Sequence, residues 1–355
     1  MKKVHLVIAD LFLPSDFAAE VCAGLHLPAL EKILARGASI QPLVLSAVEG
    51  AARTDDSRLS LEQALCGLFS VPRQSGIAPI SAEFDGLGDG FWLRADPVHV
   101  RLQREQVVLL PNVTVSADES AQLCASLNEH FAGQGMEFFA PHPSRWYVRL
   151  VELTEIITVP LSQAAGRNIH GNLPAGTDAR RWHQLFNEIQ MLLFAHPLNE
   201  AREARGEVTI NSVWFWGNGE GAAPAPAPAQ CDYGSASSDE VLVEMLAASA
   251  GILFDSWQPA WRSTEGRQLL VWTGLRSALQ RGDLAGWRSA LQQFETGYAQ
   301  PLWQALRKGQ ISQLQVDILG GDSLRQIRLA RGDAWAFWRR SQPLAYYSAE
   351  SKNNE

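Results

Sequence analysis

The chain has 355 residues, of which 46% are hydrophobic and 19% are charged, and its formal net charge is -8. Such a length accommodates one large α/β domain or two domains, and the composition is that of an ordinary soluble globular protein. The acidic balance argues against nucleic acid or a membrane as a partner. The four cysteines are scattered and form no CxxC motif, which favours reduced thiols in a cytoplasmic protein over disulfides or a zinc site.

The N-terminal part of the chain alternates between strand and helix patterns. Residues 4–9 form an apolar run that predicts a buried strand. Residues 27–37 have apolar positions at helical spacing, with Gly37 as the expected stop. Residues 60–72 predict a second amphipathic helix that ends at a proline. This alternation indicates a parallel sheet covered by helices.

The pattern changes after Phe91. Residues 91–110 alternate polar and apolar side chains, as the two strands of a hairpin do. Residues 116–133 begin with a capping-box pattern and predict an amphipathic helix, and residues 145–153 predict another strand. A hairpin, a helix and a strand in series predict an inserted α+β lobe over residues 91–204.

From residue 205 the chain returns to an α/β pattern. Residues 208–217 are apolar and β-prone, which predicts a central strand of the main sheet. Residues 220–230 are rich in proline and alanine and predict a linker or surface loop. Ser238 is the expected cap of the next helix. Further strands and a long, bent helical stretch then complete a predicted core made of residues 1–90 and 205–355.

One polar cluster follows a helix that ends at Pro197. His196, Asn199 and Arg202 lie on the turn and at the start of the next helix. Arginine and histidine together suit a phosphate or carboxylate group. The same side chains could instead tie the helix end to a neighbouring strand, and the sequence leaves both interpretations open.

Two further clusters have a similar ambiguity. Arg94, Asp96 and His99 could form an ion-paired cluster at the hinge of the inserted lobe. The Gly-rich loop around Arg167 and His170 either lines a ligand site or is an ordinary surface loop.

The stretch from Trp182 to Gly219 combines the HPLN and WFWGNG motifs with intervening Arg, Gly and Asn residues. This pattern resembles cofactor-independent phosphoglycerate mutases of the archaeal type, which belong to the alkaline phosphatase superfamily. It resembles more closely a bacterial branch of that group, the regulatory proteins of the RpfE type. The resemblance extends over nearly the whole chain. It implies an α/β fold with an alkaline-phosphatase-like core, that is, a mainly parallel sheet flanked by helices, plus the inserted lobe.

The resemblance also implies phosphoryl transfer by two metal ions and a Ser or Thr nucleophile. It assigns Asp10 to the first metal-ligand position, Ser60 to the nucleophile and Asp322 to a later ligand position. From the residues alone, the favoured role of Asp10 is that of a hydrogen-bonding residue at a strand end, and that of Ser60 is a helix cap. Two other ligand positions are occupied by Arg276 and Gln280, and a guanidinium repels a cation.

These replacements predict that no two-metal centre forms and that no cofactor is bound. All eight histidines lie at or before residue 196, so the C-terminal third offers no imidazole ligand. The predicted function is that of a catalytically degenerate phosphoglycerate-mutase-like protein, with a binding or regulatory role in the bacterial cytoplasm. Its expected ligand is a phosphorylated or carboxylated small molecule, and the candidate binding residues are His170, His196, Asn199, Arg202 and Arg167.

The alternative is an active phosphomutase or phosphatase with a rebuilt site. Such an enzyme would use Asp10, Ser60 and Asp322 together with a divalent metal such as manganese or zinc. Metal analysis combined with a mutase assay distinguishes the two functions.

Overall fold

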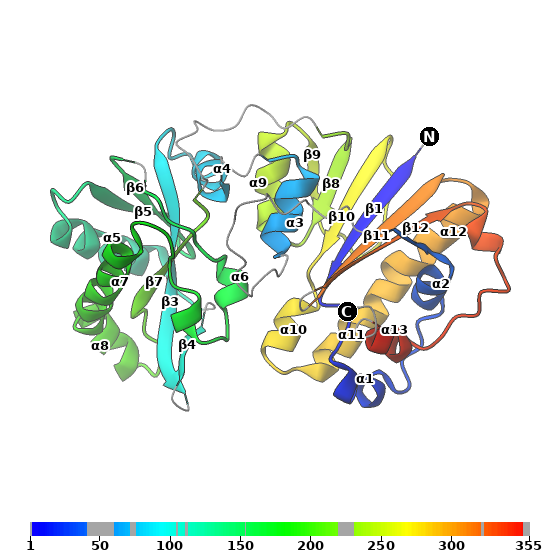
Figure 1. Cartoon of the computed structure of the whole chain (residues 1–355), viewed down its shortest axis with the longest axis horizontal. Helices are drawn as coiled ribbons and strands as arrows, with labels where there is room; N and C mark the ends of the chain where they lie inside the picture. The colour runs from blue at the N-terminus through cyan, green and yellow to red at the C-terminus, as the bar shows by residue number, and fades with distance from the viewer. Residues whose placement is uncertain are drawn as a thin grey trace. The chain divides into compact units, whose positions relative to one another are not determined.

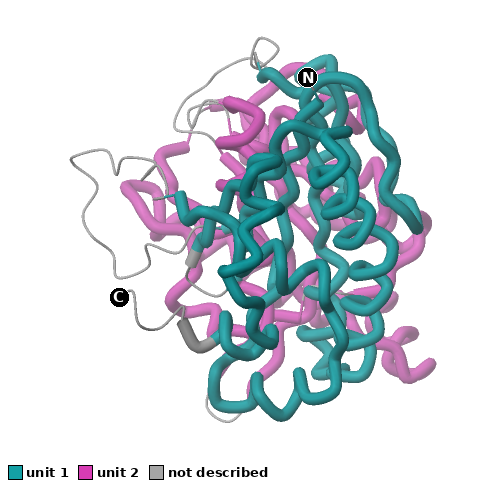
Figure 2. Tube along the Cα trace, turned by 90° about the vertical axis from the view of Figure 1, so that its right-hand side faces the viewer, with its two compact units in different colours: residues 1–61, 231–355 teal, residues 62–230 magenta. Residues whose placement is uncertain are grey.

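The computed structural model folds the chain into strands and helices that divide into two compact units (Figure 1). Unit 1 comprises residues 1–61 and 231–355, and unit 2 comprises residues 62–230 (Figure 2). The structure describes residues 2–40, 60–71, 76–103, 106–110, 113–152, 154–218, 231–320 and 323–350.

Unit 1 is built on a seven-stranded, mainly parallel sheet with the strand order β2-β12-β11-β1-β10-β8-β9. Its parallel strands are β1 (Lys3–Ala9), β8 (Ser235–Ser238), β9 (Leu253–Ser256), β10 (Arg267–Trp272) and β11 (Gln313–Gly320). β12 (Ser323–Ala330) and β2 (Ala38–Ile40) are antiparallel additions at one edge. The apolar run at residues 4–9 therefore forms the central strand, buried on both faces.

Helices cover this sheet, as the strand–helix alternation predicts. The helices of unit 1 are α1 (Ser15–Cys22), α2 (Pro28–Arg36), α9 (Val241–Ser249), α10 (Arg276–Gln280), α11 (Leu284–Phe294), α12 (Gln300–Lys308) and α13 (Leu344–Glu350). The α/β fold class with a mainly parallel sheet flanked by helices is confirmed. Among the described residues, no helix has both the length and the apolarity needed to span a membrane.

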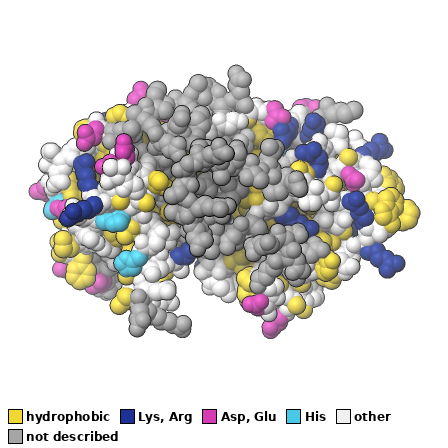
Figure 3. All heavy atoms as spheres, in the orientation of Figure 1, with side chains coloured by type: hydrophobic (Ala, Val, Ile, Leu, Met, Phe, Trp, Pro, Cys, Tyr) yellow, Lys and Arg dark blue, Asp and Glu magenta, His cyan; other side chains and the backbone are white. Residues whose placement is uncertain are grey.

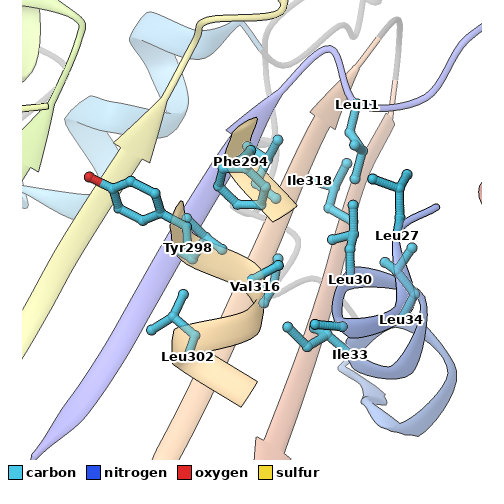
Figure 4. Close-up of a cluster of buried hydrophobic side chains, with 14 of the residues drawn as sticks. Leu11, Leu27, Leu30, Ile33, Leu34, Phe294, Tyr298, Leu302, Val316 and Ile318 are labelled. Carbon is cyan, nitrogen blue, oxygen red and sulfur yellow. The ribbon is translucent and has the colours of Figure 1, made fainter. Parts of the chain in front are cut away.

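The core of unit 1 forms where α2 and the long C-terminal helical stretch meet the sheet (Figure 4). Leu30 and Ile33 on α2 contact the cluster that contains Val316 and Ile318 of β11, and all four are buried. Each such side chain contributes about 1.5–3 kcal/mol on removal from water. The helical spacing read from the sequence is thus the spacing of the buried face.

A carboxylate from a distant part of the chain caps α2. α11 and α12 are joined by the π-helical turn η3 (Glu295–Ala299), just before Pro301, where the sequence predicted a break or bend. Glu295 is 2% exposed, and its two carboxylate oxygens accept hydrogen bonds from the backbone N–H groups of Ala29 and Leu30, at 2.8 and 3.0 Å. Since the first N–H groups of a helix have no intrahelical partner, this contact closes the start of α2.

Unit 2 is an α+β unit around the strand order β4-β3-β6-β5, with β7 paired to β3. Its strands are β3 (Phe91–Gln103), β4 (Gln106–Leu110), β5 (Met136–His142), β6 (Arg145–Leu150) and β7 (Ser212–Trp216). Its helices are α4 (Ile77–Phe84), α5 (Ala117–His130), α6 (Leu161–Ala164), α7 (Ala179–Phe194) and α8 (Pro197–Ala204), while α3 (Leu61–Leu68) begins at the boundary between the units. The predicted hairpin and the capping box of α5 at Ser116 and Glu119 are both confirmed.

The placement of residues 208–217 in the main sheet is wrong. β7 is a buried strand, but it pairs antiparallel with β3 in unit 2. A strand buried on both faces has the same apolar pattern in either kind of sheet, so the sequence could not distinguish them. Unit 2 accordingly comprises residues 62–230, which is longer at both ends than the expected lobe of residues 91–204. The predicted linker at residues 220–230 lies outside the described residues.

All four cysteines are free thiols, and Cys22 and Cys124 are buried. Burial raises the pKa of the Cys124 thiol to about 12, so this side chain behaves as a small apolar group of the unit 2 core.

Candidate functional site

The candidate site lies at the carboxyl-terminal ends of the parallel strands in the unit 1 sheet. Asp10 directly follows β1, Asp239 directly follows β8, and Arg276 begins the helix after β10. β1 pairs with β10, and β10 pairs with β8, so the carboxyl ends of the three strands are neighbours. Open parallel sheets bind their ligands outside this edge.

The Asp10 backbone is held in an unusual conformation. Its φ angle is 58°, in the left-handed region that non-glycine residues rarely adopt. Its N–H donates to the Leu319 carbonyl at 2.6 Å, and its carbonyl accepts from the indole N–H of buried Trp287 at 3.5 Å. Contacts from β11 and α11 therefore fix the backbone that presents the Asp10 carboxylate.

The Asp10 carboxylate pairs with Arg276. The Arg276 Nε donates to the Asp10 Oδ2 at 3.0 Å, and the two side chains are 23% and 27% exposed. The resemblance implied a metal-ligand position at Arg276, and in the structure its guanidinium contacts the first ligand candidate, Asp10. A cation at Asp10 would have to displace a permanently charged guanidinium.

The donor set at this edge does not fit a two-metal centre. Such a centre needs several carboxylates and imidazoles converging on each ion. Within the described ranges, no three His, Cys, Asp or Glu side chains converge in a way that could hold a metal ion. The arrangement observed at Asp10 is that of an internal ion pair.

Asp239 is a site residue that sequence reasoning missed. Asp239 is exposed, and the charge of Arg276 acts on its carboxyl group. The Thr273 N–H lies 2.8 Å from the Asp239 Oδ1. The sequence did offer a signal for Asp239, since it follows the small residues 235–238. Such a run can be a short strand, and an acidic residue after it then lies at the strand end.

The sequence pattern predicted Ser238 as a helix cap instead, and that prediction is wrong. Ser238 is the last residue of β8, and its hydroxyl donates to the Val271 carbonyl at 2.9 Å. α9 is capped instead by the Glu240 side chain, which accepts from the Leu242 N–H.

The other two residues of the proposed rebuilt site stay unassigned. Ser60 is 3% exposed and stands immediately before α3. Asp322 lies outside the described residues. A nucleophilic role for Ser60 and a ligand role for Asp322 therefore stay predictions.

The cluster at the start of α8 is a structural clasp, which corrects the prediction that Arg202 and Asn199 hold an exogenous anion. Arg202 is 3% exposed, and its Nε, Nη1 and Nη2 donate to Val208 O, Glu119 Oε2 and Thr114 O at 2.9, 2.9 and 2.6 Å. Asn199 is also 3% exposed, and its amide bonds the backbone of Leu193 and Ile210. Buried donors whose partners are protein atoms present nothing to a ligand in solvent.

His196 has a similar local role. Its Nδ1 accepts from the Leu198 N–H at 3.2 Å and so caps α8, while its Nε2 lies 2.9 Å from the Ser126 hydroxyl. Burial lowers the pKa of His196, which disfavours the cationic form that an anion would require. His196 borders a groove of about 1220 Å³ between α5 and α7, but the other four predicted ligand residues do not line it.

Arg167 and His170 are both exposed on the loop that contains the 3-10 turn η2 (Ile169–Gly171). Asn168 caps this turn by accepting from the His170 N–H at 3.2 Å. Of the five residues predicted to bind an anion, Arg167 and His170 are thus the two that expose a cationic or protonatable group.

The predicted Arg94–Asp96 ion pair is confirmed, at 2.6 Å between buried groups. Arg94 also donates to the Ser81 hydroxyl of α4, and Trp216 of β7 donates to the other Asp96 oxygen at 2.7 Å. His99 takes no part, because its ring bonds Thr209. The pair therefore joins β3, β7 and α4 within unit 2.

Comparison with known proteins gives short sequence matches. No family model matches the chain. Over 60 residues it is 39% identical to a probable 2,3-bisphosphoglycerate-independent phosphoglycerate mutase from Geobacter sulfurreducens, a match covering 17% of this chain and 15% of the relative. Enzymes of the same name from Methanothrix thermoacetophila and Methanosarcina mazei are 28% identical over 106 residues and 27% over 108, each match covering 29% of this chain and 26% of the relative. The matches thus span about a quarter or less of the relatives' own length.

The structural similarity extends over most of the chain. The solved PH0037 protein from Pyrococcus horikoshii matches with a TM-score of 0.50 and 14% identity, over 92% of this chain and 87% of that one. At this identity the match supports the fold and nothing further. Taken with the short sequence matches, it indicates that the chain is similar to the cofactor-independent phosphoglycerate mutases.

Proposed function

We propose that this chain is a catalytically degenerate, phosphoglycerate-mutase-like protein that has a binding or regulatory role in the bacterial cytoplasm, as in the RpfE-type branch. The observation that carries the proposal is the 3.0 Å contact between Arg276 and Asp10. It puts a fixed positive charge on the carboxylate that related enzymes use for a metal ion.

A guanidinium stays protonated at every accessible pH, so it neutralises Asp10 permanently and opposes a divalent cation at the same place. Without a metal or an adjacent base, the Ser60 hydroxyl is a weak nucleophile. The mutase and phosphatase chemistry therefore has no support at this edge of the sheet.

The ligand of the binding role is proposed to be a phosphorylated or carboxylated small molecule. Among the residues named for it, Arg167 and His170 are the exposed pair. Arg202, Asn199 and His196 are engaged with protein groups and serve the fold of unit 2.

The test is metal analysis of the purified protein together with a phosphoglycerate mutase assay in added manganese. We expect no stoichiometric metal and no turnover. Asp10→Asn and Ser60→Ala are the matched variants. Manganese-dependent mutase activity that both variants abolish would overturn the proposal and establish the rebuilt enzyme. Phosphate-dependent stabilisation lost in Arg167→Ala would support the anionic ligand, and its absence in the wild type would reject that ligand.

A further inference from the structure

A surface of unit 1 combines exposed aromatic rings with arginines. After β12 the chain forms a compact turn, residues 331–340, which contains the 3-10 segment η4 (Asp333–Trp335). We call residues 331–340 the aromatic turn. It contains two tryptophans and a phenylalanine, with three arginines against one aspartate.

The turn is held firmly from beneath. Ala334 and Ala336 are 1% and 4% exposed, and Arg36 of α2 donates to the Ala334 carbonyl at 2.7 Å. Asp333 accepts from the Ala330 N–H at 2.8 Å, and Arg339 donates to the Arg36 carbonyl at 3.1 Å. Small residues thus anchor the backbone and leave the large ones outside.

The aromatic side chains project into solvent. Trp335, Phe337 and Trp338 are 55%, 80% and 70% exposed. Phe337 and Trp338 contact each other edge to face, with ring centroids 5.3 Å apart. Single exposed apolar residues are common, but three large rings on one anchored turn mark an interaction surface.

Cations surround these rings. Arg331, Arg339 and Arg340 are exposed on the turn itself, and the Arg307 guanidinium of α12 lies 4.8 Å from the Trp335 ring centroid. Figure 3 shows hydrophobic and Lys or Arg side chains gathered at the right-hand end of the face, where Figure 1 draws the turn after β12. The net charge of -8 averages over the chain and conceals this positive region.

We propose that the aromatic turn binds the surface of an anionic lipid bilayer. Indole and phenyl rings settle at the headgroup level, and arginines pair with lipid phosphates. A bilayer accepts projecting rings without a matching pocket, whereas a protein partner must supply one for each ring. The acidic remainder of the chain is repelled by the same surface, so binding is oriented through this turn. The proposal does not depend on the loss of catalysis.

The test is co-sedimentation of the full chain with vesicles made of equal parts of phosphatidylcholine and phosphatidylglycerol. We expect binding that weakens as salt rises and that is much weaker on pure phosphatidylcholine. Phe337→Ser with Trp338→Ser should weaken binding by roughly a hundredfold or more, since each of the two buried rings contributes at least about tenfold. Arg340→Glu should weaken it by about 30-fold, because one charge near such a surface is worth about a factor of five and reversal removes two.

Leu253→Ser is the matched control for an exposed apolar residue of unit 1, and Arg262→Glu for an exposed arginine. Both should bind as the wild type does, and circular dichroism checks that each variant is folded. The proposal fails if the wild type does not sediment with anionic vesicles, or if neutral vesicles bind it equally well. It also fails if the turn variants bind like the controls. Binding to polyglutamate, a model of an acidic protein partner, without binding to vesicles would likewise overturn it.

Discussion

Replacing Arg202 with alanine separates a structural clasp from an anion site. In the structure the guanidinium joins α8 to the loop before α5 and to the chain that leads into β7. The variant removes three charge-assisted hydrogen bonds at once and leaves two backbone carbonyls, of Val208 and Thr114, without that partner. An anion site would lose only its ligand, whereas a clasp loses the stability of unit 2.

The magnitude follows from these contacts. A hydrogen bond to a charged group contributes roughly 1.5–3 kcal/mol, and breaking a buried ion pair costs about 3–5 kcal/mol. Because the contacts share one side chain and are not additive, we expect Arg202→Ala to lower the free energy of unfolding by about 3–5 kcal/mol. A typical domain has a total stability of about 5–15 kcal/mol, so the loss is large.

Urea denaturation followed by circular dichroism measures this change, with and without phosphate. Arg205→Ala is the matched control, because Arg205 also contacts Glu119 and Glu207 but is exposed. The control should leave the unfolding midpoint nearly unchanged. If Arg202→Ala does not fold, Arg202→Lys retains the charge with a single donor group and should give an intermediate loss.

The pH dependence of this loss has a definite sign. Burial raises the pKa of Glu119, but hydrogen bonds from the Ser116 backbone and from Arg202 outweigh it and hold the pKa below its ordinary value. A depressed pKa stabilises the folded state above the unfolded-state pKa, about 4.3 for glutamate, and this contribution disappears as the pH falls through the folded-state pKa. The difference between wild type and Arg202→Ala should therefore shrink below about pH 4. A destabilisation under about 1 kcal/mol, with phosphate stabilising the wild type alone, would refute the clasp.

Three further outcomes can be checked. Glu295→Gln removes the charge and one hydrogen-bond acceptor from the cap of α2, so it should destabilise the protein by about 1–2 kcal/mol in thermal unfolding. An unchanged unfolding midpoint would show that the cap is dispensable. Tyr147→Phe should lower stability in urea by about 1–3 kcal/mol by leaving Asp85 short of a buried donor, and should raise the pKa of that carboxyl, so that acid unfolding begins at a higher pH. Arg276→Ala should still show no manganese binding by isothermal titration, because it frees Asp10 but supplies none of the further ligands that the described residues lack; stoichiometric binding by the variant would show that the guanidinium alone blocks a metal site.

The sequence predicted local features better than their assembly. The apolar run of β1, the buried face of α2 and the capping box of α5 follow from the spacing of a few neighbouring residues, and all three are confirmed. The strand at residues 212–216 was placed in the wrong sheet because a doubly buried strand has no polar face to identify its neighbours. Strand pairing depends on contacts between residues far apart in the chain, and local hydrophobic periodicity does not specify those contacts.

The same limit applies to the candidate site. Arg276 was recognisable as an unsuitable metal ligand by its chemistry alone. That its guanidinium contacts Asp10 depends on β1 and β10 being neighbours, which no local pattern states. Arg202 was recognised as an anion-binding type of side chain, but its partners at Thr114 and Glu119 are more than eighty residues away. Burial decided its role, and burial is a property of the assembled fold.

The central position of β1 imposes an order on folding. Its partners β10 and β11 begin at residues 267 and 313, so β1 cannot pair until strands far along the chain have been made. Unit 2 is one continuous segment, and its sheet pairs strands within residues 91–216. It can therefore form while the ends of unit 1 are still apart, since domains fold as units during synthesis. Until then the apolar β1 stays exposed with unpaired edges. This exposure of β1 lasts until residues 267–320 have been made and can pair with it.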